Sequence, residues 1–207
     1  TVHFLLSCNT GEILTVLLAF LLGWPEPLLA VQLLWVNLVT DSLPALALGV
    51  DPCEEGLMNR PPRQARRLFE KGEGVIMLLE GCLIGALALL AFVLGQGQLG
   101  SAAAGRTMAF GVLSFSQLVH TLNMHARVPI CHGGLRKSGR LLLAAMVGAF
   151  LQILVMVVPV LGTVFGTVGL PLFAWGEMIF LSLMPLIPSE LGKLGEERRA
   201  RRRRARN

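Results

Sequence analysis

The feature that most constrains this chain is a series of six apolar runs, at about residues 2–23, 28–50, 75–95, 107–124, 141–161 and 171–189. A helix needs roughly 20 predominantly apolar residues to cross the hydrocarbon core of a bilayer. The runs are continuous, whereas the strands of a membrane β-barrel are short segments of alternating polarity. The sequence therefore predicts an all-α, polytopic membrane protein, with six transmembrane helices bundled in one domain over residues 1–192.

Composition supports this class and argues against a nucleic-acid partner. Hydrophobic residues make up 54% of the chain and charged residues only 15%, which is too apolar a balance for a soluble domain. The net charge of +5 arises from Lys and Arg between the runs and at the C-terminus, not on an aromatic-bearing face. The four cysteines contain no C-x-x-C pair, so neither zinc nor a disulfide framework is expected. Membrane lipid is the expected partner.

The basic residues also predict the orientation, because Lys and Arg are retained on the cytoplasmic side of a membrane. Five lie in the 51–74 loop, four in the 125–140 loop and eight in the basic tail at 193–207, which leaves only Arg106 on the other side. Both termini are thus expected in the cytoplasm, and the tail is read as a membrane flank rather than a nucleic-acid arm. The protein is expected in the plasma membrane if it is bacterial.

The start of the chain suggests a piece of a longer protein. Thr1 is not a methionine, and the first apolar run begins immediately after it. No basic segment precedes the run, so it does not resemble a signal peptide.

Polar side chains inside the first two runs are the candidates for function, since an ionisable group within a span is costly. Asn9 and Glu12 are three residues apart and share one helix face. Asn37, Thr40 and Asp41 share a face of the second helix. The turn between the runs makes these helices antiparallel neighbours, so the two faces can oppose each other.

Pro44 follows Asp41 and is expected to loosen the helix near residues 40 and 41, which frees carbonyl oxygens. Carboxylate, amide, hydroxyl and carbonyl oxygens suit Ca²⁺ better than soft transition metals, although they also accept Mn²⁺. The alternative is that these side chains only hydrogen-bond between helices, which would suffice for Thr40 alone. Two acids together favour cation binding.

Longer stretches of the same region carry a family resemblance. The run Leu33–Ala45, LLWVNLVTDSLPA, with Asn59–Arg63 in the following loop, resembles the sixth transmembrane helix of type II P-type ATPases, specifically calcium pumps. Asn9–Glu12 is similar to the fifth helix of that family. The likeness spans the chain and is densest over 5–63, so the chain is expected to hold the fifth to tenth helices.

The resemblance implies metal ligands residue by residue. Asn37 and Asp41 would serve the ion site shared by calcium-transporting members. Asn9, Glu12 and Thr40, again with Asp41, would serve a second site of the sarcoplasmic-reticulum type.

One position departs from the family pattern. The second site also takes a Glu from the eighth helix, and Thr107–Ala109 aligns that helix so that Gln117 falls on the Glu position. A neutral amide is a weaker oxygen donor, so Gln117 completes the candidate metal set and predicts a single calcium ion per cycle.

The resemblance implies the C-terminal membrane half of an ATP-driven cation pump for Ca²⁺. The chain has no D-K-T-G-T phosphorylation motif, so catalytic and cofactor-binding residues are expected elsewhere, with ATP and Mg²⁺ used only by the full-length parent. The implied partners are the remaining N-terminal helices and the cytoplasmic domains of the same pump. The alternative is a stand-alone six-helix cation channel or carrier.

Other polar residues in the runs have simpler interpretations. His120 and His125 are expected at the membrane interface. Glu80 and Glu177 are expected to meet headgroup water or a neighbouring helix, and Gln152 to hydrogen-bond between helices.

Overall fold

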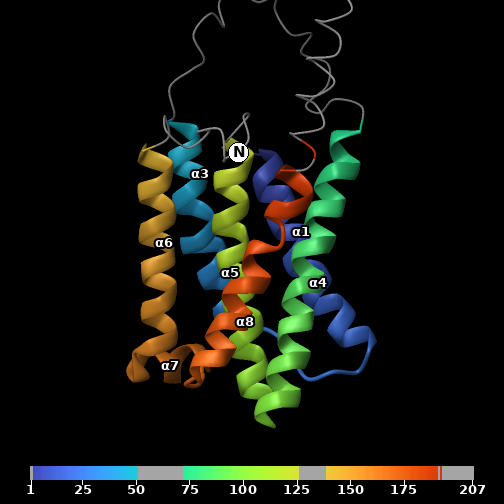
Figure 1. The fold of residues 1–207 in the computed structure, drawn as a ribbon, viewed down its shortest axis with the longest axis vertical. Coiled ribbons are helices and arrows are strands. Elements are labelled where there is room, and N and C mark those ends of the chain that lie inside the picture. Colours follow the sequence, from blue (N-terminus) through green and yellow to red (C-terminus); the bar gives the residue numbers. More distant parts are fainter. Residues whose placement is uncertain (1, 51–71, 126–138, 191, 193–207) are drawn as a thin grey trace, which may run out of the picture.

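The computed structural model describes residues 2–50, 72–125, 139–190 and 192, and every regular element in these residues is a helix (Figure 1). Most of the two basic loops and the basic tail lie outside the described residues. The elements are α1 (Val2–Leu21), α2 (Ala30–Trp35), the π-helix η1 (Val36–Asp41), α3 (Ser42–Gly49), α4 (Glu73–Leu99), α5 (Ala102–His125), α6 (Gly139–Val157), α7 (Pro159–Phe165) and α8 (Leu172–Leu183).

Five helical stretches in the described residues are long and apolar enough to cross a membrane. They are α1, the composite α2–η1–α3 (Ala30–Gly49), α4 from Gly74, α6, and α8 with its continuation to Glu190. The prediction of an all-α, multi-pass membrane protein is confirmed.

The fourth predicted span, 107–124, is the more polar α5, which lies centrally in the bundle and runs along its length (Figure 1). Its side chains from Thr107 to Ser114 are all buried, as α5 contacts α1, α3, α4, α6, α8 and η1. A helix enclosed by protein has no need of the apolar surface that a lipid-facing helix requires. The polarity of α5 therefore reflects its central position.

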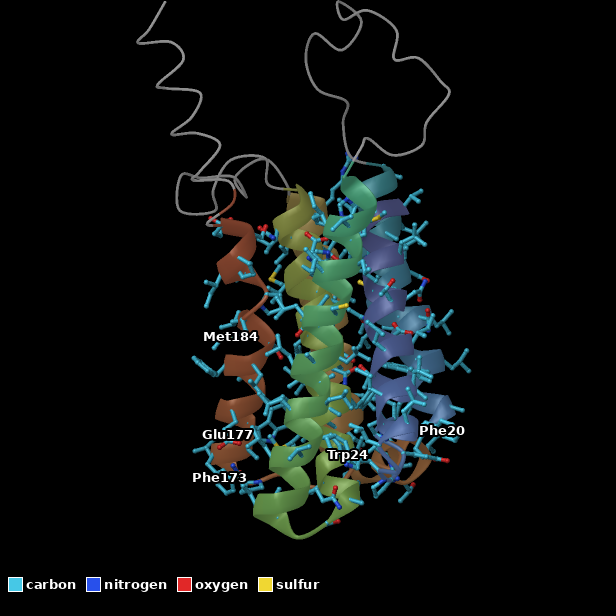
Figure 2. The ribbon with its side chains drawn as sticks, turned by 90° about the vertical axis from the view of Figure 1, so that its right-hand side faces the viewer. Phe20, Trp24, Phe173, Glu177 and Met184 are labelled. Atoms are coloured by element: carbon cyan, nitrogen blue, oxygen red, sulfur yellow. The ribbon has the colours of Figure 1, made fainter. Side chains whose placement is uncertain are left out.

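Both described ends of the chain lie at the same end of the bundle (Figure 1). The C-terminal ends of α3 and α5 and the N-terminal ends of α4 and α6 also lie there, whereas the short turns lie at the other end. Figure 2 places Trp24, Phe173 and Glu177 toward that other end. This arrangement agrees with an even number of crossings. The cytoplasmic assignment of the first end remains a prediction.

Some predicted boundaries differ from the observed ones. The predicted turn over 95–106 is mostly helical, because α4 continues to Leu99 and α5 begins at Ala102. Alanine is the strongest helix former, and Gly105 lets the two helices approach until a Cβ there would lie 2.5 Å from the carbonyl oxygen of Phe92. The predicted run 141–161 breaks at Val158, since Pro159 begins the separate helix α7.

Glycines bring α1 against α4 at the level of the candidate site. A Cβ added at Gly81 would lie 2.7 Å from the carbonyl oxygen of Ser7, and one at Gly85 would lie 2.8 Å from that of Gly11. Side chains larger than hydrogen at these positions would separate the two helices. The close approach fixes α1, which carries Glu12, onto the bundle.

Two hydrogen bonds anchor the first half of the broken helix. The indole Nε1 of Trp35 donates to Oε1 of Gln152 in α6 at 2.9 Å, and Nε2 of Gln32 donates to the carbonyl oxygen of Phe165 at 2.9 Å. The prediction that Gln152 hydrogen-bonds between helices is confirmed. The segment that precedes η1 is therefore held against α6 and α7.

Candidate intramembrane cation site

The second span does not continue as an α-helix through the polar residues. From Val36 to Asp41 it widens into a π-helix, and α3 resumes at Ser42. Pro44 has no N–H to donate to the carbonyl of Thr40, the normal partner four residues earlier. The hydroxyl of Ser42 donates to the carbonyl oxygen of Asn37, five residues earlier, at 2.8 Å. The predicted loosening near residues 40 and 41 is confirmed, and it lies at membrane depth, where irregular backbone is tolerated only within protein or along a cavity.

Glu12 lies at the centre of a side-chain network from three helices. Its side chain is buried, and its two carboxylate oxygens accept separate amide donors. Asn37 Nδ2 donates to Oε2 at 2.9 Å, and Gln117 Nε2 donates to Oε1 at 2.9 Å. Thr40 Oγ1 lies 3.5 Å from Oε1 of Gln117 and donates to the carbonyl of Val36 at 2.8 Å. The predicted faces of the first two spans therefore do meet, and α5 closes the network.

Asp41 differs from Glu12 because its carboxylate is left without donors. The residue is 1% exposed, and neither carboxylate oxygen accepts a hydrogen bond from the described residues. The thiol of Cys8 lies near enough to interact with it, and Glu12 is close enough for the two acids to repel each other when both are ionised. A buried carboxylate without partners costs several kcal/mol, on the order of the desolvation penalty for one ion. Among the residues of this cluster, Asp41 would therefore be stabilised most by a positively charged partner.

Asn9 is the predicted ligand that the structure does not bring into this network. It is half-buried on the same helix as Glu12, and its side chain makes no hydrogen bond to the rest of the described chain. The other five predicted residues converge from α1, η1 and α5. Asn37 is exposed, so the cluster reaches the outer surface of this chain beside η1.

The cluster contains two acidic side chains. Glu12 and Asp41 are its acids, and neither forms an ion pair with a described Lys, Arg or His. The part of the chain that the structure describes also holds no group of three His, Cys, Asp or Glu residues arranged for a metal. A cation bound here would therefore combine two carboxylates with neutral amide, hydroxyl and carbonyl oxygens, which is the donor set typical of Ca²⁺.

A second polar cluster was not anticipated from the sequence. Glu80 in α4 accepts from His3 Nε2 at 2.9 Å and from Ser7 Oγ at 3.3 Å, both in α1. His120 Nε2 of α5 lies 3.7 Å from the same carboxylate oxygen. The i, i+4 spacing of His3 and Ser7 was the available signal. His120 is 3% exposed and faces the bundle interior. The sequence had suggested a position at the membrane interface.

The remaining acid of the predicted spans is held by a neighbouring helix through one carboxylate oxygen, while Oε2 has no hydrogen-bond partner among the described residues. Glu177 Oε1 accepts from Gln98 Nε2 of α4 at 3.1 Å. The side chain of His125 is not among those the structure describes.

The fold and this cluster together define a multi-pass membrane protein with a buried acidic centre at a broken helix. Residues 25–195 match the family model for the C-terminus of cation-transporting ATPases. The chain belongs to this family and is an integral membrane domain of it.

Bacterial relatives agree with this assignment. The chain is 39% identical to "Calcium-transporting ATPase 1" of Bacillus cereus over 214 residues, which cover 95% of the chain and 24% of the relative. It is 35% identical to "Calcium-transporting ATPase" of Bacillus subtilis over 89% of the chain and 21% of the relative. A protein of Lactococcus lactis, "Calcium-transporting ATPase 1", is 37% identical over 58% of the chain. The chain therefore spans less than a quarter of the length of these relatives.

Proposed function

We propose that the chain is the membrane half of an ATP-driven pump that transports Ca²⁺, and that the ion is bound mainly by Asn37 and Asp41, with Glu12 as a second acid beside them. The observation that supports this most directly is the buried Asp41 carboxylate, which accepts no hydrogen bond from the described residues although it lies beside a second acid. A divalent cation between the two acids would supply the attraction that this arrangement lacks.

The residues around Asp41 provide the remaining ligands. Asn37 and Gln117 now direct their amide nitrogens to Glu12, so each must turn its oxygen toward an incoming ion. This rotation releases both oxygens of Glu12 at the same step. Thr40 contributes a hydroxyl, and carbonyls of the π-helix lie in the same segment. Binding would thus exchange two amide–carboxylate hydrogen bonds for direct contacts between these oxygens and the cation.

Gln117 supports a stoichiometry of one Ca²⁺ per cycle. It stands where the resemblance places an acid, and its amide is hydrogen-bonded to Glu12. Two divalent ions would bring four positive charges against the two negative charges of Glu12 and Asp41. Asn37 and Asp41 are the principal side-chain ligands of the single ion.

The energy for transport would come from domains outside this chain. The family uses an aspartate in a D-K-T-G-T motif, together with ATP and Mg²⁺, and the 207 residues contain no such motif. The further helices and cytoplasmic domains of the same pump would be the partners. Membership of the ATPase family supports the pump over a stand-alone channel or carrier.

The test is phosphorylation of the full-length protein from ATP, titrated separately with Ca²⁺, Mn²⁺ and Na⁺. A half-maximal response at micromolar Ca²⁺, with none to millimolar Na⁺, is expected for a donor set with two carboxylates. A response to Mn²⁺ at equal or lower concentration would indicate that the transported ion is Mn²⁺ and not Ca²⁺. Phosphorylation that needs no divalent ion beyond Mg²⁺ would contradict the proposal.

A further inference from the structure

A cavity of about 400 Å³ lies between α4, α5 and the segment that follows α8. Its walls are mostly aliphatic, and its ionisable side chains are Glu80 and His120. None of the proposed calcium ligands lines it. The volume falls within the range of small-molecule sites, which combine apolar walls with a few polar groups.

Prolines account for the gap beside α4. Helix α8 ends at Leu183, and a short helical segment resumes only at residues 186–190. Pro185 and Pro188 line the cavity and have no N–H with which to continue the α8 hydrogen-bond ladder. The interruption leaves the last described segment unable to pack on α4 as a regular helix would.

Glu80 is held so that one carboxylate oxygen stays available. Its Oε2 accepts the hydrogen bond from His3 and lies 3.3 Å from Oγ of Ser7, and His120 approaches the same oxygen. Its Oε1 accepts none from the described residues, and the side chain is 24% exposed. The His3 imidazole therefore holds the carboxylate on the cavity wall, since the single proton of the Ser7 hydroxyl has a nearer acceptor in the carbonyl oxygen of His3 at 2.9 Å.

The charge and the walls of the cavity define what would fit it. No described Lys or Arg lines it, so a ligand with an N–H-bearing cation would complement Glu80. Ile76 and Leu79 at its edge are 51% and 62% exposed on the outer face of α4. Both lie within a helix long and apolar enough to cross a membrane, so a ligand that carries acyl chains would fit this face.

We propose that this cavity binds an aminophospholipid, whose primary ammonium group donates to Glu80 while its apolar part lies along Ile76 and Leu79. The site is separate from the calcium site, although α1 carries residues of both. Glu80 is the residue that selects an amine over a neutral or anionic headgroup.

The experiment measures lipids retained by the full-length protein in native mass spectrometry. The probes are phosphatidylethanolamine, its N-acetylated derivative, which has the same chains but no ammonium, and phosphatidylglycerol. The wild-type protein should retain phosphatidylethanolamine at least about tenfold more strongly than either, as expected for one charge-assisted hydrogen bond. Equal retention of phosphatidylethanolamine and its N-acetylated derivative would overturn the proposal.

Three variants identify the residue that selects the amine headgroup. Glu80→Gln should retain the three lipids equally, whereas Glu177→Gln should behave as wild type, because Glu177 also accepts a hydrogen bond from a neighbouring helix but does not line the cavity. Leu79→Trp, at an exposed position, should reduce phosphatidylethanolamine binding while Glu80 keeps its partners. An amine preference that survives both Glu80→Gln and Leu79→Trp belongs to another surface. If Glu80→Gln does not fold, the wild-type comparison and Leu79→Trp decide the matter.

Discussion

Gln117 on α5 and Glu12 on α1 are joined by a hydrogen bond of 2.9 Å between the amide nitrogen and a carboxylate oxygen, across 105 positions of sequence. The contact places a neutral donor at the position where the resemblance to calcium pumps implies an acid. An acid at position 117 would repel Glu12 until a cation lay between them. The identity of this residue therefore bears directly on how many ions the centre can hold.

Gln117→Glu is expected to add or strengthen a second calcium site. The substitution raises the number of carboxylates in the cluster from two to three, which offsets more of the desolvation of a second divalent ion. Bound ⁴⁵Ca per phosphorylated enzyme should rise from one toward two, with a steeper Hill coefficient. Gln117→Leu, which removes the amide without adding charge, should stay at one ion. Two ions bound by the unmodified protein at micromolar calcium would contradict the single-ion proposal.

Asp41→Asn should abolish calcium-dependent phosphorylation at micromolar Ca²⁺ while the protein remains in the membrane. An amide of nearly the same shape removes the charge of a buried acid whose two carboxylate oxygens accept no hydrogen bond from the described residues. The loss of one carboxylate ligand should weaken binding by at least about a hundredfold, equivalent to roughly 3 kcal/mol. Glu26→Gln, at an exposed acid in the turn after α1, is the control and should leave the calcium response unchanged. Normal calcium affinity in Asp41→Asn would remove this residue from the site.

Gly81→Ala should destabilise the domain, whereas Gly97→Ala in the same helix should not. The new methyl at position 81 would lie 2.7 Å from a carbonyl oxygen of α1, and the one at position 97 meets nothing within 4 Å. Overpacking of this kind costs about 1–3 kcal/mol. Thermal unfolding of the purified protein in detergent measures the difference. Equal midpoints for the two variants would show that α1 and α4 are free to separate.

The orientation can be tested with impermeant thiol reagents on intact cells, in a background in which all cysteines of the full-length protein, including the four of this chain, are replaced by serine. A cysteine in the 51–74 loop should react only after the cells are opened, and Ser101→Cys should react from outside. The reason is the distribution of Lys and Arg between the two ends of the bundle. The reverse pattern at both positions would invert the topology.

The sequence predicted those parts of the site that depend on local chemistry. Glu12 and Asn37 could be matched because a short turn makes their helices antiparallel, and the effect of Pro44 follows from its missing N–H. The spacing of apolar residues could not predict the extra residue of the π-helix. It also could not predict that Asn9 lies apart from the network, because a three-residue spacing fixes a helix face but not the distance to another helix.

Contacts between helices that are distant in the sequence could not be predicted either. Nothing in the pattern around Glu80 indicates that His3 and His120 converge on it from α1 and α5. The depth at which two helices cross depends on small residues such as Gly81 and Gly85, whose role is visible only once the partner backbone is known. The fold class was thus predictable, and the second polar cluster was not.

The polarity of α5 has a consequence for how the protein is made. A translocon sorts each segment largely by its own hydrophobicity, and α5 falls short of the level that its neighbours reach. Only the residues Gly100 and Ser101 separate α5 from α4, so α4 can retain α5 in the membrane as one helical hairpin. Glycosylation mapping in microsomes should show α5 translocated when synthesised alone and inserted when α4 precedes it. The helix that carries Gln117 thus owes its place in the bilayer to the segment synthesised just before it.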